Sequence, residues 1–433
     1  MANVSVSSSA TTSETPGSYG GPLAIVTSLF FMWGFLTCLN DILVPHLKSI
    51  FDLSYARVML IQFAFFGAYF IFSLPSAKII DWIGYQRSMV LGLLMMGLGA
   101  FLFVPAASVP SYPLFLGALI VLAAGITCLQ VAANPYVTVL GRPQTASSRL
   151  NLTQAFNSLG TFLAPFFGGL LILSAAPKAM DEIRAMAPDA LQAYRLHEAA
   201  TVKTPYVGLG IALVLLAIAI GSFTLPKIEH AQHKVGEKVN DSIWNHPNLV
   251  FGAIAIFVYV GAEVSIGSFL VNYFGQPEIG GLTERVAASF VAFYWGGAMV
   301  GRFIGSGLLQ KVKTGKLLGM CAICTAGLVA ISMLTTGHVA MWSIIFVGFF
   351  NSIMFPSIFT LGVAELGPLT GDGSGIMIMA IVGGAIIPLA QGWIADKIGI
   401  HHAFFLPVIC YLYILFFALS GSKPNSERHA QAQ

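Results

Sequence analysis

The first long apolar run of the chain, which begins near residue 22, contains a single acidic residue, Asp41. A charged side chain at the centre of a membrane span costs about 2.5–3.5 kcal/mol on insertion scales, so an acid there is a candidate functional group. At helical spacing, Trp33, Thr37 and Asn40 share one face with this acid. Because Pro45 has no N–H, the carbonyl of Asp41 loses its helical partner. A carboxylate, an amide and a free carbonyl therefore meet at one level of one predicted helix.

Two later apolar runs carry pairs of amides at helical spacing. Gln130 and Asn134 are four residues apart, so they lie on one helix face. Gln154 and Asn157 are three residues apart and also share a face. The proline after Asn134 frees the carbonyl of Val131. A single buried amide is equally well interpreted as a hydrogen bond between helices, worth about 0.6 kcal/mol on average. Four amides on two helices favour a binding cavity.

The second half of the chain has its own polar set. Tyr259 and Glu263 are four residues apart, and Glu263 lies at a depth similar to that of Asp41 in the first half. Arg302 is the one clear intramembrane base, and an ion pair between Glu263 and Arg302 is an alternative interpretation of both residues. The remaining candidates in this half are Asn272, Trp295 and Asn351.

The residue types indicate the chemical class of the ligand. Amides donate and accept hydrogen bonds, carboxylates accept them, and aromatic faces stack on apolar C–H groups. This combination suits a neutral, polyhydroxylated ligand, whereas a strongly anionic ligand would need several cavity cations and a lipophilic drug would need fewer amides. The predicted substrate-binding residues are Trp33, Asn40, Gln130, Asn134, Gln154, Asn157, Tyr259, Asn272, Trp295 and Asn351.

The buried acids could also couple transport to an ion. Desolvation favours the neutral form of a carboxyl group, which can take a proton from one side and lose it to the other. Asp41 is the leading proton carrier and Glu263 the second. The carbonyl released by Pro45 and the neighbouring amide also begin a Na⁺ site, so the coupling ion stays open.

The composition predicts an all-α membrane protein. Of the 433 residues, 56% are hydrophobic and 9% are charged, against about 25% charged in a soluble domain. The net charge of +3 gives no reason to expect a nucleic-acid partner. The five cysteines lie in apolar runs, and we predict no metal site, no cofactor and no enzymatic activity.

Runs of about 20 apolar residues can span a bilayer. Twelve runs qualify, at about 22–47, 56–80, 87–107, 111–140, 148–174, 205–225, 248–274, 284–309, 315–336, 339–365, 373–395 and 401–421.

A polar stretch in the middle divides the chain into two halves that echo each other. The spacing of Gly160 and Pro165 recurs as Gly383 and Pro388. Repeated six-helix halves with a polar site between them are typical of alternating-access transporters. We expect a disordered tail at 1–20, a first half at 21–225, a linker at 226–247, a second half at 248–421 and a tail at 422–433. Lysine and arginine gather in the loops that share a side with both termini, which predicts cytoplasmic termini and linker.

Five stretches of the sequence resemble known families. The stretch from Ala77 to Arg87 resembles the loop 2–3 signature of the major facilitator superfamily, with Ala77 where that family usually has glycine. Its Asp81 and Arg87, together with Arg302, are predicted to form ion pairs or gates. The segments 40–45, 132–141 and 154–160 resemble the fucose:proton symporter family, and 261–268 resembles its glucose/galactose transporter branch.

The resemblance implies a bacterial inner-membrane monosaccharide symporter with the twelve-helix fold of the superfamily. We expect the protein to be a monomer. It gives Asp41 a role in proton coupling and sugar binding. Gln130 stands where the fucose transporter has Glu, and Cys38 where it has Asn, which favours hexoses such as glucose, galactose or mannose. Some relatives couple to Na⁺. A Na⁺-coupled symporter and an uncoupled uniporter are therefore alternatives, with a multidrug or amphiphile exporter and a sugar sensor less favoured.

Overall fold

The structure is a computed structural model that describes residues 19–51, 55–109, 111–171, 182, 185–226, 228 and 241–424. Within these ranges, the side chains of residues 39–51, 55–60, 165–171 and 199 lie outside the description. Most of the expected tail at 1–20 and most of the expected linker at 226–247 therefore fall outside the described residues, as does most of the tail from 422 onward.

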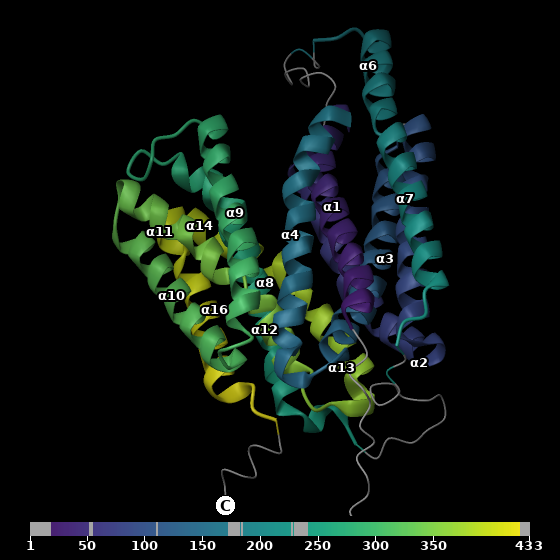
Figure 1. The fold of residues 1–433 in the computed structure, drawn as a ribbon. Coiled ribbons are helices and arrows are strands. Elements are labelled where there is room, and N and C mark those ends of the chain that lie inside the picture. The colour runs from purple at the N-terminus through teal and green to yellow at the C-terminus, as the bar shows by residue number, and fades with distance from the viewer. Residues whose placement is uncertain are drawn as a thin grey trace, which may run out of the picture.

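The first half of the chain forms long, nearly uninterrupted helices (Figure 1). They are α1 (Gly20–Phe51), α2 (Tyr55–Ser108), α3 (Tyr112–Val139), α4 (Ala146–Leu171), α6 (Pro188–Thr201) and α7 (Lys203–Ser222). The 54-residue α2 is two helices joined at Gly84, whose φ of 82° and ψ of 168° are not helical. Glycine has no Cβ and tolerates positive φ, so the chain turns there between the predicted runs 56–80 and 87–107.

The second half is more broken. Its helices are α8 (Pro247–Phe274), α9 (Glu284–Leu308), α10 (Thr314–Leu334), α11 (Gly337–Asn351), α12 (Met354–Gly362), α13 (Thr370–Met379), α14 (Gly383–Ile398), α15 (Ile400–Ala403) and α16 (Phe405–Phe416). The pairs α11–α12, α13–α14 and α15–α16 each make one membrane span with an interruption inside it. Between α13 and α14 a short 3₁₀ turn replaces the regular helix.

The number of spans agrees with the sequence. Among the described residues, ten stretches are long and apolar enough to cross a membrane. One of them, Ile61–Ser108, contains both arms of α2. Helix α4 is not among the ten, but its 26 residues are long enough to cross a bilayer. Counting the arms separately and adding α4 gives the twelve predicted membrane helices.

The two halves pack a corresponding pair of helices through corresponding glycines. In the first half, a Cβ at Gly160 of α4 would collide with the carbonyl of Phe31 in α1. In the second half, a Cβ at Gly383 of α14 would collide with the carbonyl of Phe257 in α8. Small residues let membrane helices approach backbone to backbone. The repeat seen in the sequence therefore marks the same packing contact in each half.

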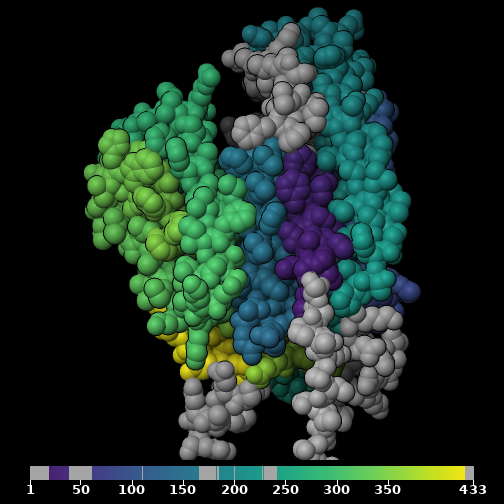
Figure 2. All heavy atoms as spheres, viewed as in Figure 1, coloured from purple at the N-terminus to yellow at the C-terminus, as the bar shows by residue number. Residues whose placement is uncertain are grey.

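The halves meet at one end of the bundle, which we call the closed end (Figure 1). There Lys78 of α2 donates to Asp372 of α13 over 2.8 Å. The hydroxyls of Ser147 and Thr360 are 2.6 Å apart, which joins α4 to α12. In Figure 2 the second half (green) touches α4 (blue) in the lower part of the view and separates from it toward the top.

The glycine contact in the second half gives a direct test. Gly383→Ala should lower the thermal unfolding temperature of the purified protein, because a methyl group there must push α14 away from α8, at a cost of about 1–3 kcal/mol. Gly327→Ala in α10 is the matched control, since a Cβ there meets nothing within 4 Å. It should leave the unfolding temperature unchanged or raise it. An unfolding temperature for Gly383→Ala at or above the wild-type value would contradict this packing.

Candidate functional site

Asp41, the first acid of the predicted site, lies on α1. Its side chain falls outside the described residues, as does that of Asn40. The backbone of α1 stays helical through Pro45 to Phe51. The nearby Trp33 is buried, and its ring lies 5.3 Å from that of Phe30. The positions of Asn40 and Asp41 in the site therefore remain predictions. Trp33, by contrast, is part of the hydrophobic core.

Three of the four predicted amides form a buried cluster in the first half. Gln130 donates from Nε2 to the hydroxyl of Tyr69 over 2.7 Å. Gln154 donates from Nε2 to Oδ1 of Asn134 over 3.4 Å. Within the described part of the chain, Oε1 of Gln130 and Nδ2 of Asn134 have no partner. The cluster therefore keeps one acceptor and one donor free for a ligand.

Asn157 has a different role. Its Nδ2 donates to the carbonyl of Phe30 over 2.9 Å, and its own carbonyl lies against Gly34 of α1. Thr161 adds a second hydrogen bond to this seam, from its hydroxyl to the carbonyl of Gly34 over 3.3 Å. In this conformation the amide of Asn157 holds α4 against α1.

The second half holds a hydrogen-bonded network around Asn351. Its Nδ2 donates to the hydroxyls of Tyr294, over 3.0 Å, and Tyr411, over 2.9 Å. The hydroxyl of Tyr259 is 2.8 Å from Oε1 of Glu263 and 3.2 Å from the carbonyl of Asn351. Tyr294 and Tyr411 were missed by the sequence analysis. A buried tyrosine hydroxyl usually needs a polar partner, and that rule could have marked both.

Two other predicted residues of this half stand apart from the network. Asn272 is exposed near the end of α8. Trp295 is 42% exposed and packs against Gly267. Its ring stacks edge-on against Tyr294 at 5.0 Å, so it reaches the network only through that neighbour.

Arg302 joins the two halves, and the ion pair with Glu263, the alternative interpretation of both residues, is not formed among the described residues. Its guanidinium donates to the carbonyl of Ser352 over 3.2 Å and to the carbonyl of Gln154 over 3.4 Å, and it also contacts the hydroxyl of Ser158. A guanidinium has five N–H donors and can serve several acceptors. Because α9 packs directly on α4, two of these acceptors, Gln154 and Ser158, come from α4. The charge of Arg302 acts on Glu263 only from a distance.

The two predicted gate residues of the signature stretch have different surroundings in the structure. Asp81 lies 3.7 Å from Lys78, which also bonds Asp372. The carboxylate of Asp81 therefore belongs to the closed end. Arg87 is exposed, and no ion pair of its side chain lies among the described residues. The sequence analysis missed Asp372 because a single acid at a helix start is common on any protein surface.

The carbonyl freed by a proline is used by the opposite half. Val131 lies one turn before Pro135, and its carbonyl accepts a hydrogen bond from the hydroxyl of Ser374 in α13 over 2.8 Å. Ser374 is fully buried. The sequence predicted this free acceptor on α3, but it did not identify Ser374 as the donor.

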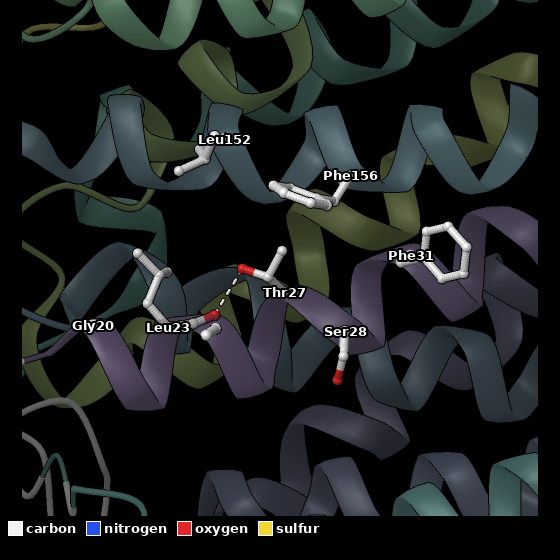
Figure 3. Close-up of a pocket in the computed structure, with 8 residues that line it drawn as sticks. Gly20, Leu23, Thr27, Ser28, Phe31, Leu152 and Phe156 are labelled. Atoms are coloured by element: carbon white, nitrogen blue, oxygen red, sulfur yellow. Dashed lines mark hydrogen bonds between the residues drawn. The ribbon is translucent and has the colours of Figure 1, made fainter.

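A separate groove lies between α1 and α4 (Figure 3). Its two hydroxyls bond their own helix: Thr27 donates to the carbonyl of Leu23 over 2.7 Å, and Ser28 donates to that of Ile25 over 2.6 Å. With Phe31 and Phe156 also lining it, the groove is apolar and is distinct from the amide cluster.

Comparisons with known proteins agree with the fold. The family model described as Major Facilitator Superfamily matches residues 25–387. The chain is 54% identical to the glucose/galactose transporter of Brucella abortus, over 95% of this chain and 97% of that protein. It is 37% identical to the L-fucose-proton symporter of Escherichia coli, over 93% of each. A crystal structure of a superfamily transporter, FucP, in the outward conformation matches with a TM-score of 0.86 and 35% identity, over 94% of this chain and 100% of that one.

The hydrogen bond from Ser374 predicts how the closed end opens. Ser374→Ala leaves the carbonyl of Val131 unpaired, which costs about 1–3 kcal/mol. The closed end should therefore open more often, and a reporter cysteine at position 146, in a background without the five native cysteines, should react with maleimide at least about fivefold faster. Ser343→Ala is the control, because Ser343 bonds the carbonyl of Ala340 in its own helix. Equal rates for Ser374→Ala and the parent protein would contradict the role of this bond.

Proposed function

The chain belongs to the Major Facilitator Superfamily and, within it, to the family of fucose-proton symporters and glucose/galactose transporters, and on that premise we propose that it imports a neutral hexose by symport with H⁺. The observation that carries the proposal is the 54% identity to a glucose/galactose transporter along 95% of the chain. The protein is accordingly a multi-pass membrane transporter and not an enzyme.

The buried amides support a neutral sugar as the substrate. The free Oε1 of Gln130 and Nδ2 of Asn134 offer one acceptor and one donor in the first half. Oδ1 of Asn351, which has no partner among the described residues, offers an acceptor in the second half. Sugar hydroxyls both donate and accept, so they fit such a set. Arg302 is already occupied by carbonyl and hydroxyl oxygens, which disfavours an anionic substrate.

We assign coupling to Asp41 and Glu263, and the geometry around Glu263 suggests how a proton would reach the sugar site. Tyr259 has one hydroxyl hydrogen and two acceptors, Oε1 of Glu263 and the carbonyl of Asn351. An ionised carboxylate is the stronger acceptor. Protonation of Glu263 would release the phenol toward Asn351, whose amide holds Tyr294. Proton binding to Glu263 would thus change the hydrogen bonds of Asn351, the residue that offers its Oδ1 to the sugar.

The distribution of basic residues supports an orientation. If the lysine- and arginine-rich loops are cytoplasmic, the closed end is cytoplasmic and this conformation faces outward. The similarity to a transporter solved in the outward conformation supports the same assignment. Both termini would then lie in the cytoplasm of a bacterium, flanking two six-helix halves at 21–225 and 248–421 that work as one monomer in the inner membrane.

Two alternatives keep specific support. Sodium could replace the proton, because Asn40 and the carbonyl of Asp41 released by Pro45 are oxygen ligands of the kind found at Na⁺ sites. An uncoupled uniporter would follow if neither acid titrates during transport.

The first prediction concerns the driving ion. Proteoliposomes that contain the protein should accumulate labelled glucose or galactose when an inward proton gradient is imposed. Asp41→Asn should lose this accumulation, because the amide cannot carry a proton. Stimulation by a Na⁺ gradient alone would favour the sodium alternative, and transport that responds to neither gradient would leave a uniporter.

The second prediction concerns the acid of the second half. Glu263→Gln should retain sugar exchange across the membrane but lose proton-driven accumulation, since binding survives and titration does not. Tyr259→Phe should weaken accumulation in the same assay, because it removes the hydroxyl whose hydrogen bond depends on whether Glu263 is protonated. Glu284→Gln is the matched control, as Glu284 is exposed in the first turn of α9. Full proton-driven accumulation by Glu263→Gln would remove Glu263 from the coupling path.

A further inference from the structure

One amide of the second half has no part in the network described above. Gln391 of α14 is fully buried, and neither its Nε2 nor its Oε1 has a hydrogen-bond partner among the described residues. Ser265 of α8 is also fully buried, and its hydroxyl is likewise unpaired there. Three unpaired polar atoms are costly inside a membrane protein, so such a group calls for a ligand.

The packing of α8 and α14 places these two residues opposite each other. Beyond the contact at Gly383, a Cβ at Gly261 of α8 would collide with the side chain of Ile387 in α14. The two helices therefore run in the same direction with matched turns. Four residues further along each helix, one turn on, lie Ser265 and Gln391. The seam continues at Phe269, one turn further along α8, because a Cβ on Gly392, the residue after Gln391, would lie 3.5 Å from its ring.

The residue types define what this seam can hold. The amide supplies two N–H donors and one acceptor, and the hydroxyl supplies one donor and one acceptor. A cation would be bound only by oxygens and repelled by the amide N–H groups, and an anion would leave the amide oxygen without a donor. A neutral O–H group satisfies both side chains, because it donates and accepts at once.

We propose that Ser265 and Gln391 form a binding site for a neutral hydroxyl group in the seam between α8 and α14. The hydroxyl comes from an internal water or from the sugar, and the second source rests on the proposed function. The first half lacks the amide at the corresponding position of its sequence. The position that corresponds to Gln391, eight residues after Gly160, is Gly168, which has no side chain to supply an amide.

Thermal unfolding of the purified full-length protein, with and without sugar, tests the site. Gln391→Met keeps the length of the side chain and removes its hydrogen bonds, and Ser265→Ala is the smaller change. Thr325→Val is the matched control, because the Thr325 hydroxyl is also buried and unpaired but lies in α10. Removing a polar group that truly lacks a partner should leave the unfolding temperature unchanged or raise it.

If water fills the site, Gln391→Met and Ser265→Ala should both unfold below the wild-type temperature without sugar, while Thr325→Val should not. If a sugar hydroxyl fills it, both variants should bind glucose or galactose about tenfold more weakly, the loss of one ordinary hydrogen bond. One monodeoxy analogue, which lacks that hydroxyl, should then bind variant and wild type equally.

The proposal is overturned if both variants unfold at or above the wild-type temperature and bind the sugars with unchanged affinity. A wild-type protein that no hexose stabilises would instead reject the proposed substrate. The sugar-free measurement would still decide whether water fills the seam, so the two failures are distinguishable.

Discussion

Inside a bilayer a polar group must find its partner within the protein, because the lipid offers none, and this constraint organises the whole molecule. The backbone meets it by forming helices across nearly every described residue. Where a helix cannot meet it, another element does. Pro135 deprives the carbonyl of Val131 of its helical partner, and Ser374 of the opposite half supplies a hydroxyl. A local defect in one helix thus becomes a contact between halves.

The same constraint separates structural polar groups from functional ones. Asn157 and Arg302 donate hydrogen bonds to carbonyls of neighbouring helices, so they hold helices together in this conformation. Gln130, Asn134 and Asn351 each use one end of the amide and leave the other unpaired. A transporter needs groups of the second kind, since they can exchange a protein partner for a substrate hydroxyl.

The sequence predicted the twelve spans well, because hydropathy and helix length are local properties. It also predicted that the amides at 130, 134 and 154 gather together, since helical spacing fixes which face each occupies. It could not predict the partners of Arg302, because they depend on how α9 of one half rests on α4 of the other. Ser374 and Asp372 were missed for the same reason: neither is unusual until α13 is placed against the first half.

We propose that a neutral sugar crosses the membrane together with H⁺ and that Asp41 and Glu263 carry this coupling. The most direct test is the charge that accompanies each sugar molecule, measured as the current and the labelled uptake of the same proteoliposome preparation after a jump in glucose or galactose concentration. We expect an inward positive current with a fixed charge-to-sugar ratio, and we expect the size of this current to depend on pH in the absence of Na⁺. Sugar uptake without current would contradict coupling and leave only facilitated diffusion.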